Sequence, residues 1–208
     1  MDRAPRFRFL PQTSLARGIA LACLLVAVAI VGIGLWRGLL SEAAPTIGGG
    51  FALTDQFGKP RTDADFRGQY MLVFFGFTNC PDICPIELQT MSEALDQLDA
   101  KDAAKVTPIF ITVDPARDTP EALRAYAGNF HPRLVALTGT ADAIGSVAKA
   151  YRVYYARATG TTAPNDPSAY ILDHTAVVYL MGPNGEFVTH FNPGTTAQAM
   201  AEDLRSRL

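Results

Sequence analysis

Two cysteines, Cys80 and Cys84, stand in the stretch Thr78–Pro85, whose surroundings favour reactive thiols. The apolar run Tyr70–Phe77 before them predicts a buried strand, and apolar residues at helical spacing over Ile86–Leu98 predict a helix after them. Free backbone N–H groups and the positive end of a helix dipole favour a thiolate over a thiol. A thiolate pair at this junction can bind a metal or attack a disulfide. The alternative is a pair of small apolar core residues.

A metal held by two thiolates usually takes at least one more ligand. Thiolates select soft ions such as Cu(I), or Zn(II). The chain has three histidines. We expect His131 and His190 to be solvated or packing residues, because polar side chains are mostly exposed. His174 differs, because it has polar neighbours and lies between a loop rich in Gly and Pro and an apolar strand. It is therefore the best candidate for the third ligand.

Strands and helices alternate over the rest of the chain. Further buried strands are predicted over 106–113, 134–137 and 175–180, helices over 121–129, 140–150 and 196–208, and hairpins over 51–58 and 183–191. One helical turn over 63–67, a polar connection over 101–105, an extended segment over 152–155 and a mobile loop over 159–169 complete the pattern. This order predicts an α/β fold with a mixed sheet and flanking helices. A cysteine loop after an inner strand of such a sheet is the thioredoxin-like arrangement.

The N-terminal part predicts a membrane anchor. Gly18–Trp36 has no charged residue over nineteen positions, close to the ~20 that span a bilayer. Arginines dominate residues 1–17, which predicts a cytoplasmic N-terminus, an anchor over 18–37, a flexible tether over 38–50 and an exported domain over 51–208. We therefore expect a single-pass protein of the bacterial inner membrane with its C-terminal domain in the periplasm. A cleaved signal peptide is the alternative, although its apolar core is usually shorter.

The charge of the chain and the placement of its cysteines narrow the range of possible functions. Residues 42–208 hold 13 basic and 19 acidic side chains, a net charge of −6, which argues against nucleic acid as a partner and leaves room for a basic protein. Cys23 lies in the predicted anchor and is expected to be an apolar filler. The exported domain then keeps one close cysteine pair, whose disulfide would close a very small loop and stabilise little. A redox or metal role fits that pair better than a structural one.

Three stretches resemble the Sco/SenC family, exported copper-binding proteins that assist cytochrome c oxidase assembly. They are FGFTNCPDICP at 75–85, TVDPARDTP at 112–120, and DHT at 173–175 before an apolar strand. The resemblance covers about 46–208 and implies that Cys80, Cys84 and His174 bind copper, as Cu(I) or Cu(II). It also implies a copper chaperone whose partner is the copper-site subunit of cytochrome c oxidase or another copper carrier, and which delivers copper or reduces the cysteines of that site.

Other functions stay open. An exported thiol–disulfide oxidoreductase would use the same cysteines as catalytic residues, but such enzymes carry Cys-x-x-Cys, and here three residues separate the pair. A peroxiredoxin-like peroxidase would need a Pro-x-x-x-Thr-x-x-Cys pattern, and Val73 and Phe77 stand in the Pro and Thr places. Zinc could bind two cysteines and a histidine, yet structural zinc sites usually have four protein ligands. A metallochaperone is therefore favoured over an enzyme.

Overall fold

The computed structural model describes residues 13–39, 47–158 and 170–208. The chain divides into two units, Met1–Pro45 and Thr46–Leu208. The first unit contains helix α1 (Thr13–Leu39), whose described leucine, isoleucine and valine side chains are exposed. Within the described residues, no helix combines the length and the apolar character needed to cross a membrane. The transmembrane assignment of residues 18–37 stays a prediction.

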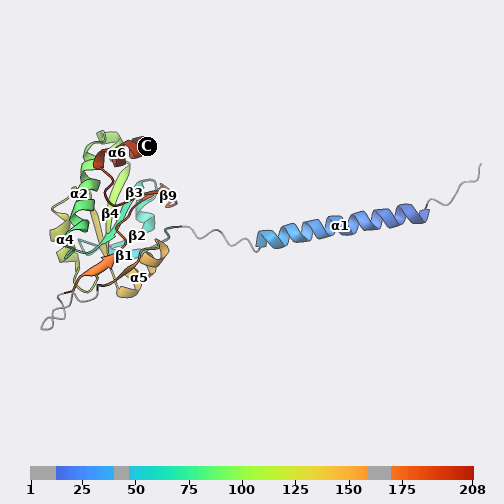
Figure 1. The fold of residues 1–208 in the computed structure, drawn as a ribbon, viewed down its shortest axis with the longest axis horizontal. Coiled ribbons are helices and arrows are strands. Elements are labelled where there is room, and N and C mark those ends of the chain that lie inside the picture. The colour runs from blue at the N-terminus through green and yellow to red at the C-terminus, as the bar shows by residue number, and fades with distance from the viewer. Residues whose placement is uncertain (1–12, 40–46, 159–169) are drawn as a thin grey trace, which may run out of the picture. The chain divides into compact units, whose positions relative to one another are not determined.

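The second unit, which carries the C-terminus marked in Figure 1, is built on a seven-stranded sheet. The order of its strands is β2-β1-β5-β4-β3-β8-β9. Strand β3 pairs in parallel with β4, and β4 with β5, while the other neighbouring pairs are antiparallel. The strands are β1 (Ala52–Asp55), β2 (Pro60–Thr62), β3 (Tyr70–Gly76), β4 (Val106–Thr112), β5 (Val135–Thr138), β8 (Val178–Met181) and β9 (Phe187–Phe191). The predicted mixed sheet is confirmed, and its inner strands β3 and β4 are almost wholly buried, as expected for strands covered on both faces.

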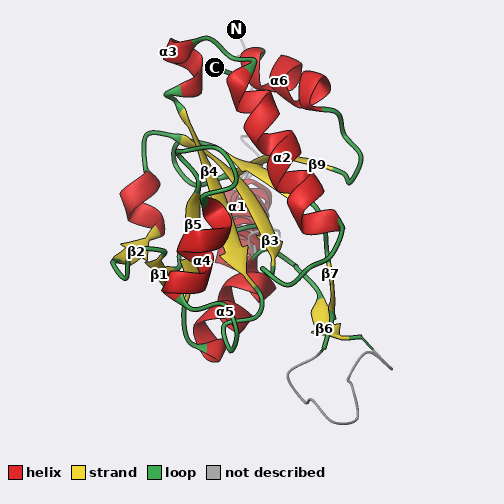
Figure 2. Ribbon diagram, turned by 90° about the vertical axis from the view of Figure 1, so that its left-hand side faces the viewer, coloured by secondary structure: helices red, strands yellow, loops and turns green. Residues whose placement is uncertain are grey.

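Helices surround this sheet (Figure 2). They are η1 (Asp63–Phe66), α2 (Ile83–Asp96), α3 (Ala100–Ala103), α4 (Pro120–Ala127), α5 (Ala141–Ala150) and α6 (Ala197–Arg205). Thr119, Thr140 and Thr196 cap α4, α5 and α6, each accepting a hydrogen bond from the backbone N–H three residues on. Such caps satisfy N–H groups that the first turn of a helix leaves without partners, which explains why the predicted starts of these helices are accurate.

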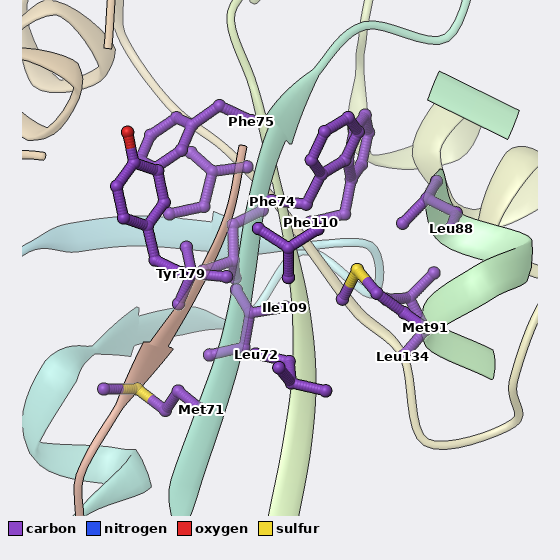
Figure 3. Packing of buried hydrophobic residues seen from close by; sticks show 14 of the residues in the cluster. Met71, Leu72, Phe74, Phe75, Leu88, Met91, Ile109, Phe110, Leu134 and Tyr179 are labelled. Atoms are coloured by element: carbon purple, nitrogen blue, oxygen red, sulfur yellow. The ribbon is translucent and has the colours of Figure 1, made fainter. Parts of the chain in front are cut away.

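Strand β3 divides the core into two layers, because successive side chains point to opposite faces. Phe74 packs against Phe110 on the face covered by α2, from which Leu88 and Met91 point inward (Figure 3). Phe75 packs on the other face, where its ring lies 6.3 Å from that of Tyr179. The cysteines that follow β3 are thus attached to a strand held from both sides.

A second, two-stranded sheet carries the histidine. Strands β6 (Tyr155–Arg157) and β7 (Leu172–His174) pair antiparallel, with Tyr155 opposite His174. Among the described strands these two pair only with each other. The predicted mobile loop 159–169 lies outside the described residues, so its mobility stays a prediction.

Several elements differ from the sequence prediction. Helices α4 and α6 end at Ala127 and Arg205 rather than at residues 129 and 208, and the extended segment expected over 152–155 is the strand β6 at Tyr155–Arg157. Helix α2 begins at Ile83, three residues before the predicted start. The predicted polar connection over 101–105 is wrong, because Ala100–Ala103 form the short helix α3, capped by the Asp99 carboxylate. The strand predicted from residue 175 begins only at Val178, because the chain first passes from one sheet to the other.

Candidate metal centre

The structure brings together all three candidate ligands. The two Sγ atoms of Cys80 and Cys84 and a ring nitrogen of His174 lie within 4.8 Å of one another. His131 lies elsewhere, its Nδ1 accepting a hydrogen bond from the Arg133 N–H, and His190 stacks on Phe187 with ring centroids 6.3 Å apart. The three donor atoms are therefore close enough to share one metal ion.

The start of helix α2 positions both cysteines. Cys84 is the second helical residue and Pro85 the third, where its missing N–H costs no helical hydrogen bond. Cys80 lies one turn earlier, and its Sγ accepts a hydrogen bond from the Cys84 backbone N–H at 3.4 Å. The free amides of the helix terminus therefore face the Cys80 sulfur, which is the arrangement that stabilises a thiolate.

The two thiols have opposite electrostatic environments. A hydrogen bond from the Cys84 thiol lowers the pKa of Cys80 to about 4, and hydrogen bonds from the backbone of Asp82 and Cys84 add to this shift, although burial of Cys80 opposes it. The same Cys80–Cys84 hydrogen bond, together with full burial, raises the pKa of Cys84 well above its usual range. Cys80 is thus the thiolate at neutral pH, and Cys84 is the thiol that donates to it.

Asp118 fixes the loop that leads to Cys80. Its carboxylate accepts hydrogen bonds from the Thr78 N–H at 3.0 Å, from the Thr78 hydroxyl at 2.6 Å and from the Thr112 hydroxyl at 2.5 Å. Burial raises the pKa of Asp118, while these hydrogen bonds oppose that shift. The cap of the following helix is Thr119, so Asp118 is left to hold the cysteine loop. No local signal could pair it with Thr78, forty residues away.

His174 is held by aromatic rings and by its own backbone. Its ring makes edge contacts with Phe74 and Phe77, with centroids 6.0 and 5.8 Å apart. Nδ1 lies 3.1 Å from the Thr175 carbonyl oxygen, and Nε2 lies 3.3 Å from the Cys84 Sγ. Because a carbonyl oxygen only accepts, Nδ1 carries the proton of the neutral ring. The Nε2 lone pair is then directed at the sulfur atoms, where a metal ligand is needed.

The fold and this cluster define a class. A mixed α/β sheet with a cysteine pair at the start of the helix after an inner strand is thioredoxin-like, and a histidine near both sulfurs distinguishes this protein as a candidate metal binder. The family model described as SCO1/SenC matches residues 41–208. The chain therefore belongs to the SCO1/SenC family.

Individual relatives agree with that assignment. The human protein SCO1 homolog, mitochondrial, is 44% identical over 167 residues, covering 77% of this chain and 54% of the human sequence. This chain thus matches only about half of that relative's length. The copper-bound structure of Bradyrhizobium japonicum ScoI is 45% identical, with a TM-score of 0.70 over 78% of this chain and 99% of that one. BsSco, described as a Sco-family cytochrome c oxidase assembly protein with a disulfide switch, is 25% identical, with a TM-score of 0.60 over 79% and 95% of the two chains.

Proposed function

We propose that this protein is a copper chaperone that holds one copper ion through Cys80, Cys84 and His174. The observation that carries the proposal is the convergence of the three donor atoms within 4.8 Å. One preformed thiolate, a second thiol beside it and a directed imidazole lone pair suit a soft ion such as Cu(I). ScoI, a relative of the same fold, is described with copper bound.

The copper ion is cargo in this proposal. Binding requires the Cys84 thiol to lose its proton, since thiolates are the ligands. The recipient is the copper-site subunit of cytochrome c oxidase or another copper carrier, in line with the assembly role stated for BsSco. The protein either delivers copper to the recipient subunit or first reduces the cysteines of that subunit. Both actions require a reduced Cys80–Cys84 pair.

Copper titration of the reduced domain tests the ligands. We expect one Cu(I) per chain, no tight binding in Cys80→Ser or Cys84→Ser, and weakened binding in His174→Ala with an altered spectrum of the Cu(II) form. His190→Ala is the matched control and should bind as the parent does, because His190 stacks on Phe187 away from the cluster. Unchanged affinity in all three ligand variants would remove the proposal.

An exported thiol–disulfide oxidoreductase is the second candidate, favoured by the low pKa of Cys80 beside a second thiol. A Cys80–Cys84 disulfide uses both thiolates, so a chaperone should take up copper only when reduced. We expect diamide-oxidised protein to take up no copper. Equal copper uptake by the oxidised and reduced forms would show that the cysteines are not ligands. A redox role would then remain as the candidate function of the cysteine pair.

We further propose that residues 18–37 anchor the protein in a bacterial inner membrane, with residues 1–17 cytoplasmic, 38–50 as a tether and 51–208 in the periplasm. The uncharged run Gly18–Trp36, the arginines before it and the exposed apolar side chains of α1 support this topology. Reporter fusions should show a cytoplasmic signal at Arg8 and a periplasmic signal after Leu208. An active periplasmic reporter at Arg8 would contradict it.

A further inference from the structure

The segment between β4 and α4 contacts both the loop that leads to Cys80 and the residues just before His174. At one end, Asp118 holds Thr78 of the cysteine loop. Asp114 and Arg117 of the same segment hold Tyr170, four residues before His174 and just ahead of β7. Among the described strands β6 and β7 pair only with each other (Figure 2). The main sheet therefore contacts His174 through side chains such as Phe74, and not through backbone pairing with β7.

The contacts on Tyr170 form a buried network. Its hydroxyl donates to the Asp114 carboxylate at 2.7 Å, and the Arg117 Nη1 donates to the Tyr170 carbonyl oxygen at 2.9 Å. The Arg117 Nε donates to Asp114 as well. Tyr170 is 6% exposed and Asp114 is 4% exposed, so water competes little with these hydrogen bonds.

The guanidinium group of Arg117 also lies over the Tyr170 ring. The Arg117 guanidinium carbon lies 3.7 Å from the Tyr170 ring centroid, and Arg157 of β6 lies 4.1 Å from the same centroid. Tyr170 thus packs between one arginine of the β4–α4 segment and one of the two-stranded sheet. A lysine could not reproduce the forked hydrogen bonds and the stacking together.

We propose that Arg117 is a positioning residue for His174. Through Tyr170 it sets the place of β7, and thereby the distance between the imidazole and the two sulfur atoms. The inference rests on the proposed function, because it treats His174 as a ligand. It adds that the imidazole is held ready for the metal by a network that includes none of the ligands themselves.

A double-mutant cycle tests the proposal. Cu(I) affinity is measured anaerobically against a competing chelator for the parent, Arg117→Lys, His174→Ala and the double variant. If Arg117 acts through His174, Arg117→Lys should lower affinity about tenfold, as loss of outer partners of a ligand does. It should change nothing once His174 is absent. Equal losses in both backgrounds, or no loss in the parent background, would overturn the proposal.

Matched variants exclude a general effect on folding. Arg124→Lys is the control, because the Arg124 guanidinium carbon lies over the Phe57 ring, 5.3 Å from its centroid, and not over Tyr170. It should keep parental affinity. Tyr170→Phe keeps the ring and removes only the hydrogen bond to Asp114, so it should give a smaller loss in the same direction as Arg117→Lys. An unchanged affinity in Tyr170→Phe together with a large loss in Arg124→Lys would speak against the network.

A metal-free readout separates this inference from the proposed function. In protein without copper, Arg117→Lys should speed amide hydrogen exchange in β7 and shift the NMR signals of the His174 ring, with β3 and β4 unchanged. If His174→Ala does not weaken copper binding, the proposed ligand set fails, and faster exchange in β7 still supports the positioning role. Unchanged exchange and ring signals would overturn that role even where copper binds as proposed.

Discussion

Cys80 and Cys84 stand where β3 meets α2, whereas His174 stands on the two-stranded sheet β6–β7 outside the seven-stranded one. We call the first region, residues 76–87, the thiol half and the second, residues 154–157 with 170–175, the imidazole half. The thiol half follows a strand that is hydrogen-bonded on both sides and covered on both faces. The imidazole half depends on side-chain contacts, chiefly those of Tyr170 and the rings around His174.

The two halves therefore differ in how rigidly they hold their candidate ligands. The thiol half has little spare volume, since Cys84 is fully buried and its sulfur lies over Gly76. The imidazole half has an exposed turn, where the Tyr154 N–H donates to the Thr175 hydroxyl oxygen. We infer a fixed thiol pair and a more adjustable third ligand, an arrangement that suits the copper carrier proposed above. Local opening generally draws on regions with few buried contacts.

The largest expected effect comes from filling the space over Gly76. A Cβ added there would lie 2.6 Å from the Cys84 Sγ and 2.9 Å from the Phe110 ring. Real Cβ atoms do not approach so closely, and overpacking a core costs about 1–3 kcal/mol. We expect Gly76→Ala to lower the free energy of unfolding by about 3 kcal/mol, measured by urea denaturation, and to weaken copper binding because Cys84 must move.

Gly128 provides the control for that substitution. A Cβ at Gly128 would meet backbone oxygens at 3.5 Å, an ordinary contact, and its φ of −62° suits alanine. Gly128→Ala should therefore leave stability within about 0.5 kcal/mol of the parent, as for most neutral sites. Equal stability of Gly76→Ala and Gly128→Ala would show that the thiol half can adapt and would break the comparison.

Two threonine substitutions, one in each half, test the same difference in rigidity through smaller changes in stability. Thr78→Val removes the hydroxyl that donates to buried Asp118 at 2.6 Å, and Thr175→Val removes the exposed acceptor of the Tyr154 N–H. We expect a loss of about 1–2 kcal/mol for Thr78→Val and about 0.5 kcal/mol or less for Thr175→Val, because water can replace only the second bond. Urea unfolding measures both. A larger loss in Thr175→Val would reverse the assignment of rigid and adjustable halves.

The two halves also differ in how far the sequence predicts them. The strand before Cys80 and the helix after Cys84 follow from apolar periodicity, and both cysteines are close in the chain, so the thiol half is a local prediction. Only its helix start was misplaced, at residue 86 instead of Ile83, because Pro85 suits several positions of a first turn. Short helix α3 was missed because its four residues show no apolar period.

The imidazole half depends on contacts between distant residues. His174 could be selected as a candidate by its neighbours and by elimination, but its approach to Cys84 joins residues ninety positions apart. The roles of Asp118, Arg117 and Tyr170 come from buried polar contacts across 40 to 56 positions. Periodicity describes one element at a time, so it carries no information on which carboxylate meets which hydroxyl.

Glu87 gives the last test of how tightly the thiol half is packed. It lies on α2 three residues after Cys84 and is 1% exposed. Its Oε1 accepts a hydrogen bond from the Gly194 N–H at 3.3 Å, and its Oε2 has no hydrogen-bond partner within the described part of the chain. Burial raises the pKa of Glu87 above its ordinary value of 4.5, which the Gly194 hydrogen bond only partly offsets.

A raised pKa in the folded state fixes the sign of the pH dependence. The contribution of Glu87 to stability is fully present below its ordinary pKa and is lost as pH rises through the folded value. Glu87→Gln does not titrate, so the free energy of unfolding of the variant minus that of the parent should increase as pH rises from 4.5 and level off above the folded pKa of Glu87. The increase should be the smallest of the three effects, and urea titrations across this range measure it. A flat difference for Glu87→Gln would mean that water reaches this carboxylate, and the thiol half would then be as open as the imidazole half.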